Sequence, residues 1–573
     1  MSLIAELKRR KVFKVGGAYL VVGWLAIQVA TSVLPLYGTP DWFLRAFVLV
    51  VLLGFPIALV MAWVFDITPE GVKLDAASTG SKRVFAASAV LIAFVLGWYF
   101  HGMPVSRNAA KSPSASAAPA VVAADSHSIA VLPFVDMSQA KDQEYFSDGL
   151  SEELLNLLAQ VPQLRVIART SSFSFKGKEV DVATIAKALN VANVLEGSVR
   201  KSGNTLRITA QLIRTSDSSH LWSQTYDREL TDIFKVQDEI ANAVVSALKV
   251  QLLPDQTMTN THRSSNAEAY NQFLLGNEFY ARMNPENWRR AIDAYQQAIT
   301  LDGHYAAAYA ALASSEGRLA DNLGDAALSE QALATADKAI SLAPELADGY
   351  VSRGTMWLAY RRDWGRAQAD FDKALALNAG DSNVQLGRAR LLIALGRLPE
   401  AIAALRKAVE LDPLAGDSWA QLGRMLNASG QLPLARQALS RALEITPESD
   451  FAHFHLGETD LLEGKPQDAL ALYQHAGNYG PAGVAMAEYS LGHAKESQQA
   501  LDEQIAKYAQ GSAYQVAEIY AWRGEKDKAF EWLDRAYAQH DGGLSFIKND
   551  PLIAKLRGDP RYAAMLKKLG LPE

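Results

Sequence analysis

The chain has 573 residues, 49% of them hydrophobic and 21% charged, a length that corresponds to about three or four domains of ordinary size. Its formal net charge is −6 and it contains no cysteine, which excludes disulfides, thiolate metal ligands and cysteine nucleophiles. A mildly acidic chain also lacks the clustered Lys and Arg that sequence-independent binding of nucleic acid requires, so we expect no nucleic-acid partner.

Positive charge is concentrated at the N-terminal end of the chain. Residues 1–83 contain nine Lys and Arg against five Asp and Glu, a net of +4, so residues 84–573 carry −10. This end also contains three apolar runs, each about as long as the 17 to 25 residues that cross a bilayer: 15–37, 42–65 and 84–100. They predict a membrane segment over residues 1–101 with three transmembrane helices.

The distribution of Lys and Arg predicts the orientation of this segment, because cytoplasmic loops retain positive charge. Five basic residues between Lys8 and Lys14 precede the first run, and three between Lys73 and Arg83 precede the third, whereas residues 38–41 contain none. The N-terminus should therefore be cytoplasmic, and everything after the third run should lie in the periplasm of a bacterium, anchored in the inner membrane. A cleaved signal peptide is the alternative for the first run, but two further apolar runs follow it.

Residues 102–127 are rich in Ala, Ser and Pro and show no apolar periodicity, which predicts a flexible linker. The pattern beyond it predicts a small α/β domain over residues 128–253. Its expected elements are a strand at 128–134, a helix at 144–161, a strand at 164–170, a helix at 181–190, a hairpin at 192–214 that turns at Ser202 to Asn204, and a closing helix at 233–250.

This domain resembles the FlgO and TolB amino-terminal domain family of bacterial envelope proteins. The resemblance is carried by SIAVLPF (128–134), EYFSDGLSEEL (144–154), ANVLEGSVRKSGNTLRITAQLIR (192–214) and HLWSQTYDREL (220–230). It implies a domain that makes protein contacts in the cell envelope and has no catalytic role. The first hundred residues, with FDITPEGV at 65–72, are similar to the membrane segment ahead of this domain in some proteobacterial repeat proteins, and relatives are sometimes named adenylate cyclases.

Alanine pairs seven residues apart recur at a 34-residue interval in the second half of the chain: Ala367 and Ala374, Ala401 and Ala408, Ala435 and Ala442, Ala469 and Ala476. This period of paired helices is typical of tetratricopeptide repeats (TPRs), because small residues let adjacent helices approach closely. The pattern predicts an all-α superhelical TPR solenoid of seven or eight repeats over residues 266–540. Residues 541–573 leave the period and should cap the last apolar face.

We find no motif for chemistry that outweighs a structural interpretation. SFSFKGK at 172–178 lacks the glycine-rich cradle of a phosphate-binding loop, and a nucleotide cyclase would need a further catalytic domain for which no segment remains. His455 and Glu458 share a helix face, but two ligands make a weak metal site, and helix packing is the favoured interpretation. We therefore expect no enzyme activity, no cofactor, no metal and no small-molecule substrate.

The candidate binding site is the groove of the predicted superhelix, which the first helix of each repeat lines. A register set by Ala374, Ala408 and Ala442 turns six polar side chains toward it: Arg353, Asn383, Arg390, Gln421, Arg424 and Asn427. Arg390 and Arg424 fall one period apart, and guanidinium forks bind carboxylates bidentately, so we expect a ligand with an acidic segment or a free carboxyl terminus. The alternative is that each arginine pairs with an acidic residue of a neighbouring helix.

Together these features predict a membrane-anchored periplasmic scaffold or adaptor that binds protein or peptide partners of the cell envelope through its repeats and its α/β domain. The alternative is a transmembrane sensor that relays an envelope signal through a cytoplasmic partner. A sensor normally has a cytoplasmic output domain, whereas here the cytoplasm would contain only a tail of about 14 residues and a loop of about 18. The scaffold is therefore the favoured hypothesis.

Overall fold

The computed structural model describes residues 19, 22–26, 28, 47, 51, 65–68, 71–74, 125–139, 144–229, 232–250 and 264–572. The chain divides into two compact units, Met1–Ala120 and Val121–Glu573. Nearly all of the three predicted membrane runs and of the predicted linker lie outside the described residues. No helix in the described part of the chain is both long and apolar enough to span a bilayer. The first unit contains a hairpin of β1 (Phe65–Thr68) and β2 (Gly71–Leu74), which pair antiparallel.

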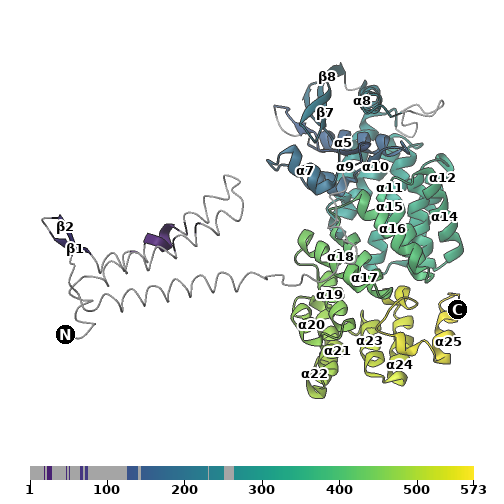
Figure 1. Ribbon diagram of the computed structural model, residues 1–573. Helices are drawn as coiled ribbons and strands as arrows, with labels where there is room; N and C mark the ends of the chain where they lie inside the picture. Colours follow the sequence, from purple (N-terminus) through teal and green to yellow (C-terminus); the bar gives the residue numbers. More distant parts are fainter. Residues whose placement is uncertain are drawn as a thin grey trace, which may run out of the picture. The chain divides into compact units, whose positions relative to one another are not determined.

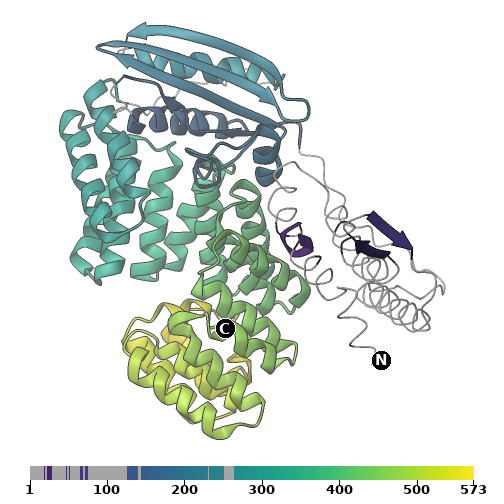
Figure 2. The ribbon, with the colours of Figure 1, turned by 90° about the vertical axis from the view of Figure 1, so that its left-hand side faces the viewer.

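The second unit opens with a small mixed α/β sheet domain (Figure 1), which we call the sheet domain. Its strands are β3 (Ser128–Val131), β4 (Val135–Asp136), β5 (Arg165–Val166), β6 (Asn193–Ser202), β7 (Thr205–Arg214) and β8 (Ser219–Glu229). The strand order is β5-β3-β6-β7-β8, and β4 also pairs with β6. The β3 pairings are parallel, whereas the long strands β6, β7 and β8 lie antiparallel and side by side (Figure 2). Its helices are α5 (Glu144–Ala159), α6 (Arg169–Phe173), α7 (Val182–Leu189) and α8 (Ile233–Ala247).

The hairpin of β6 and β7 follows the predicted pattern. Along β7, buried side chains such as Leu206, Ile208 and Ala210 alternate with more exposed ones, which is the period-two pattern of a strand with one covered face. The predicted strand at 164–170 is wrong beyond its first residues, because β5 ends at Val166 and α6 begins at Arg169. A contact outside the domain explains this difference, since the Ala168 amide donates to the carbonyl of Leu411 at 2.8 Å.

The sheet domain is followed by an all-α array of helix pairs, which confirms the predicted fold class for this part of the chain. Residues 264–572 contain eight consecutive pairs. The pairs are α9 (Ala267–Tyr280) with α10 (Pro285–Leu301), α11 (Ala306–Leu323) with α12 (Ala326–Leu342), α13 (Ala347–Met356) with α14 (Trp364–Leu377), α15 (Ser382–Ala394) with α16 (Leu398–Leu411), α17 (Gly416–Ala428) with α18 (Leu432–Ile445), α19 (Asp450–Leu462) with α20 (Pro466–Tyr473), α21 (Gly480–Ser490) with α22 (Ala494–Tyr508), and α23 (Ala513–Arg523) with α24 (Lys526–Ala538).

Small residues hold the helices of each pair together. The eight alanines that set the predicted period are at most 1% exposed. A side chain on Gly423 would collide with Leu439 of α18, and one on Gly457 would collide with Tyr473 of α20. The close packing that the 34-residue period predicts is therefore present, with large apolar residues of the second helix set against glycines of the first.

One turn of π-helix, Trp357–Arg361, interrupts the regular spacing between α13 and α14. A π turn inserts one residue into a helix, and its effect is visible in the sequence distance between contacting residues. Gly354 precedes its neighbour Phe371 by 17 residues, whereas Gly423 precedes Leu439 by 16. The register of α13 is therefore shifted by one residue from the one that Ala374 predicts.

The segment after α24 does more than cover the last pair. It comprises η5 (Gly542–Phe546), η6 (Ala554–Leu556) and α25 (Pro560–Lys568), and its apolar side chains share one core with α21 and α23. It also contacts helices that lie much earlier in the sequence. Asn549 Nδ2 donates to the carbonyl of Ile393, on α15, at 2.6 Å, and Trp364 Nε1, on α14, donates to the carbonyl of Leu569 at 3.3 Å. We call residues 541–572 the C-terminal segment.

The sheet domain and the start of the array form one hydrophobic core. Leu150 and Leu154 of α5 belong to the same buried cluster as Tyr270 of α9, and Gly149 leaves no room for a side chain beside Leu274. A second contact lies at the α16–α17 loop, as described below for Asp412. The sheet domain therefore packs against the repeats rather than standing apart from them.

Candidate binding surface on the inner face of the array

Consecutive first helices of the array contact one another, as α11 contacts α13, α17 contacts α19, and α21 contacts α23. They line one surface, which we call the inner face. In each first helix one residue of this face directly follows a buried Gly or Ala: Asn277, Arg318, Thr355, Arg390, Arg424, Glu458, Met486 and Glu518. We call this place the inner-face position. Because it recurs in every pair, its occupants show what each stretch of the surface contacts.

The sheet domain covers the inner face at the N-terminal end of the array. Asn277 Nδ2 donates to Oε1 of Glu152, on α5, at 3.4 Å, and Tyr295 Oη donates to Asn277 Oδ1 at 2.8 Å. Glu152 in turn accepts from Arg169 Nε at 3.1 Å. The first inner-face position is therefore used for contacts within the chain.

The C-terminal segment covers the inner face at the other end. The Arg424 guanidinium lies 3.4 Å from the centroid of the Phe546 ring, a close cation–π contact. Beneath the segment, Tyr514 Oη donates to Asp550 Oδ2 at 2.9 Å, and Glu518, 2% exposed, is hydrogen-bonded to the same carboxyl group. Burial, followed by the charge of Asp550, raises the pKa of Glu518 well above its ordinary value.

His455 and Glu458 are part of the same buried region. His455 Nδ1 contacts Glu458 Oε2, and the two residues are 4% and 1% exposed. Burial lowers the pKa of His455 well below its ordinary value and raises that of Glu458 to about 7. Burial thus favours the neutral form of both side chains, and their contact lies within the packing of the helices, which agrees with the packing role expected from the sequence.

Between these two covered ends the inner face is open. Arg318 and Arg390 are exposed, and Thr355 between them is half-buried. Arg318 donates from Nε to the hydroxyl of Tyr280 at 2.7 Å. Although Arg390 is exposed, the surrounding inner face desolvates its guanidinium in part, and this effect, with the positive charge of Arg318, lowers its pKa. The two arginines therefore lie close enough to influence each other.

The six predicted groove residues do not all lie on this open stretch. Asn383 and Arg390 are exposed on α15. Arg353 is held by two carboxylates, with Nη2 2.7 Å from Asp370 Oδ1 and Nη1 2.7 Å from Asp337 Oδ1. The π turn explains this outcome, because the shifted register turns Arg353 between α12 and α14 and places Thr355 at the inner-face position. For Arg353 the structure therefore shows the pairing with neighbouring acidic residues.

The three predicted residues on α17 also differ in environment. Asn427 is only 2% exposed, donates to the carbonyl of His455 at 2.8 Å and accepts from Thr459 Oγ1 at 2.9 Å. In this arrangement it has no free group for a peptide backbone, which corrects its expected orientation. Gln421 is half-buried and its Oε1 lacks a hydrogen-bond partner within the described residues. Arg424 is covered by Phe546, so only Asn383 and Arg390 of the six remain open.

Arg318 was missed in the sequence, although a signal for it was present. Gly317 and Arg318 repeat the small-residue and arginine pair of Gly423 and Arg424. The pair was hidden because α11, with 18 residues, is longer than the other first helices of the described array and moves it out of the 34-residue register.

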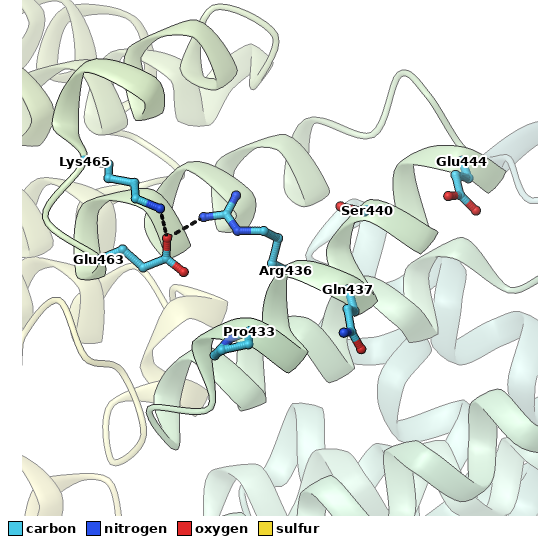
Figure 3. A pocket seen from close by; sticks show the side chains of 7 residues that line it. All are labelled: Pro433, Arg436, Gln437, Ser440, Glu444, Glu463 and Lys465. Atoms are coloured by element: carbon cyan, nitrogen blue, oxygen red, sulfur yellow. Dashed lines mark hydrogen bonds and ion pairs between the residues drawn. The ribbon is translucent and has the colours of Figure 1, made fainter. Parts of the chain in front are cut away.

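A separate pocket of about 560 Å³ lies against α18, away from the inner-face positions (Figure 3). Glu463 Oε2 accepts from Arg436 Nη2 at 2.9 Å and from Lys465 Nζ at 2.6 Å, as the dashed lines in Figure 3 show. Arg436 also pairs with Asp460 at 2.6 Å. Each charged group at this end of the pocket therefore has a partner within the chain. No cluster of three or more His, Asp or Glu side chains suited to a metal ion occurs in the described part of the chain.

The comparisons with known proteins agree with this two-part architecture. The tetratricopeptide repeat family TPR_16 matches residues 358–416 and 386–450. Residues 125–243 match a second family, described as the second domain of HilA/YgeH-like transcriptional regulators. The chain is thus a TPR repeat protein with an α/β domain ahead of the repeats. The second description differs from the FlgO and TolB resemblance of the motifs, which stays an interpretation.

Among curated proteins, a Rhizobium meliloti (strain 1021) protein named "Putative adenylate cyclase 3" is 37% identical over 249 residues, which is 42% of this chain and 40% of the relative. The chain therefore spans less than half of that relative's length. Similar solved structures include PilW, a type IV pilus biogenesis factor (20% identity, 36% of this chain and 96% of that one, TM-score 0.32), and the TPR protein YrrB (22% identity, 37% and 99%, TM-score 0.27). At these scores the structural likenesses carry no argument about function.

Proposed function

We propose that this chain is a scaffold or adaptor that binds protein partners of the bacterial cell envelope, chiefly through the open stretch of the inner face. One observation carries the proposal: the sheet domain covers one end of the inner face, the C-terminal segment covers the other, and the stretch around Arg390 stays exposed. Because other parts of the chain cover both ends of the inner face, the exposed stretch between them is a surface of limited extent on which a partner can bind. TPR arrays generally bind proteins or peptides on such surfaces, which supports this function.

We further propose that residues 1–101 anchor the chain in the inner membrane and leave the sheet domain and the array in the periplasm. The apolar runs and the distribution of Lys and Arg support this location. The FlgO and TolB resemblance of the sheet domain favours it as well. The protein then acts by holding a partner at the membrane, without enzyme activity of its own.

A second candidate is a signalling role in which the envelope part reports to a cytoplasmic partner. The match of residues 125–243 to a domain of transcriptional regulators and the name of the curated relative both favour signalling or regulation. Both candidates use the same protein-binding surface, so they differ in what partner binding causes rather than in where the partner binds.

Photo-crosslinking in cells tests the proposed function. A photoreactive amino acid at Asn383, on the inner face, should give a discrete protein adduct, whereas the same amino acid at Arg406, exposed on the second helix α16, should not. Position 406 is the matched control because it lies in the same pair. Adducts of equal yield from both positions, or none from position 383, would reject the inner face as the partner surface.

A further inference from the structure

Most N–H donors of the Arg318 and Arg390 guanidinium groups have no acceptor among the residues that the structure describes. Arg318 donates from Nε to Tyr280, and within the described part of the chain its two terminal nitrogens have no acceptor. Arg390 makes no hydrogen bond and no ion pair with any residue that the structure describes. A guanidinium group carries five N–H donors in a planar fork that matches the two oxygens of a carboxylate. The open stretch therefore presents donors without acceptors.

Two carboxylates, of Asp321 and Asp417, lie in the same part of the inner face. Their charges act on Arg390, but neither is within the 4.0 Å of an ion pair with it. They offset the mutual repulsion of the two arginines at longer range and leave the forks unoccupied. A ligand that places one or a few acidic side chains here fits this pattern better than a dense polyanion, which Asp321 and Asp417 would repel.

Contacts within the chain show which groups an inner-face arginine can bind. Arg424, at the position equivalent to Arg390 in the next repeat, is covered by Phe546 of the C-terminal segment. The same segment brings the Asp550 carboxyl group into the buried region that Arg424, Glu518 and Glu458 share. An apolar and acidic stretch of chain is thus already seated across the inner face one repeat away from the open arginines.

From these contacts we infer that Arg318 and Arg390 together bind an acidic side chain from an extended segment of a protein partner, laid across α11, α13 and α15. This inference rests on the proposed function and adds the chemistry of the partner. It also assigns the binding pair as Arg318 with Arg390 rather than Arg390 with Arg424, because Arg424 is occupied by the C-terminal segment.

A binding titration on the full chain in detergent tests the inference. The probe is a fluorescent peptide of about twelve residues with Glu among Ala and Gln, amidated at its carboxyl terminus, and the reference peptide has Gln in place of each Glu. Replacing both arginines (R318Q with R390Q) should weaken binding of the Glu peptide about a hundredfold, roughly tenfold for each charged hydrogen-bonding group. Raised ionic strength should weaken it as well.

The matched control replaces Arg289 and Arg406, which are exposed on the second helices α10 and α16, with Gln (R289Q with R406Q), and should leave binding unchanged. The single variant R390Q, which alters only one exposed side chain, should show the intermediate loss. Equal affinity of the Glu and Gln peptides, equal affinity of the two double variants, or binding that needs a free carboxyl terminus would overturn the inference.

The two proposals fail in distinguishable ways. If the crosslinked adduct from position 383 persists in the R318Q and R390Q variant, the inner face binds a partner and the acidic contact is wrong. Absence of the adduct in the unaltered chain rejects the proposed function itself. A circular dichroism melt within a few degrees of the unaltered protein establishes that both double variants are folded.

Discussion

At the scale of single residues, the array depends on positions where no side chain fits. Gly423 lies against Leu439 so closely that an added methyl group would overlap the leucine side chain. Leu439 is fully buried and cannot move aside without disturbing its own neighbours. Such a glycine is a packing requirement of the pair rather than a source of flexibility.

Replacing Gly423 with alanine should therefore destabilise the array by about 1 to 3 kcal/mol, the usual cost of overpacking a filled interior. Gly365 is the matched control, because it lies in the first turn of α14 and an added methyl group would meet only the Asp363 side chain, at 3.7 Å. Gly365→Ala should be neutral or slightly stabilising. Chemical denaturation of both variants checks this, and equal stability of the two would mean that Gly423 is not a packing position.

The buried carboxyl group of Glu458 gives the array a dependence on pH. Its pKa is raised from 4.5 to about 7, first by burial, so the folded state binds a proton that the unfolded state has lost. The stability that this proton contributes is complete below pH 4.5 and is lost as the pH rises through 7. The total is on the order of 3 kcal/mol.

Glu458→Gln keeps the shape of the side chain and removes the titration. Between pH 4.5 and pH 8 the free energy of unfolding should fall less steeply in this variant than in the unaltered protein. Glu518, whose raised pKa depends mainly on burial and on Asp550 and to a smaller extent on the charge of Glu458, remains in both proteins. Parallel curves of stability against pH would show that Glu458 does not titrate in this range.

At the scale of elements, the sequence predicts those parts that depend on local pattern and misses those that depend on distant contacts. The helix at 144–161, the hairpin at 192–214 and the paired helices of the array have the expected type and place. The α6 helix does not, because the turn before it is fixed by a hydrogen bond to Leu411, more than two hundred residues away. Its own residues carry no signal of this contact.

The difference between local pattern and distant contacts also explains which residues of the candidate site could be predicted. Asn383 and Arg390 could be placed from the 34-residue period alone, since α15 keeps its register. The π turn at Trp357–Arg361 moved Arg353, and the return of the C-terminal segment covered Arg424. A cap on the last repeat was expected, but its contacts with α14 and α15 depend on how the whole array curves, which no local pattern encodes.

One contact between elements should hold the sheet domain on the array. The backbone amide of Ser171 donates to Asp412 Oδ1 at 3.0 Å, the Ser171 hydroxyl group contacts the same oxygen, and all of these groups are buried. Asp412→Ala would leave the Ser171 amide unsatisfied, which costs about 1 to 3 kcal/mol. We expect faster hydrogen exchange at residues 168–174 in this variant.

Asp372→Ala is the control for this variant, because Asp372 is exposed on α14 and, among the described residues, accepts only a long hydrogen bond, 3.4 Å, from Gln368. It should leave exchange at residues 168–174 unchanged. If both variants exchange at the same rate there, the Asp412 contact does not hold the two parts together.

At the scale of the whole molecule, the proposed location makes a prediction about topology. A reporter enzyme that is active only in the periplasm should work when fused after Pro104 and should fail when fused near Ala77, because on the proposed topology the basic residues around Lys82 would hold that loop in the cytoplasm. A cytoplasmic reporter at the same two sites is the control and should give the opposite result. The reverse pattern would remove the proposed periplasmic role.

The central claim is that the chain covers both ends of its inner face and leaves the stretch around Arg390 open to a partner. Because the chain contains no cysteine, a single introduced cysteine reports on one place only. Arg390→Cys and Arg424→Cys put the thiol at equivalent positions in adjacent repeats. We predict maleimide labelling at least about ten times faster at position 390, and faster labelling at position 424 once Phe546→Ala uncovers it. Equal rates at the two positions in the otherwise unaltered chain would contradict the account.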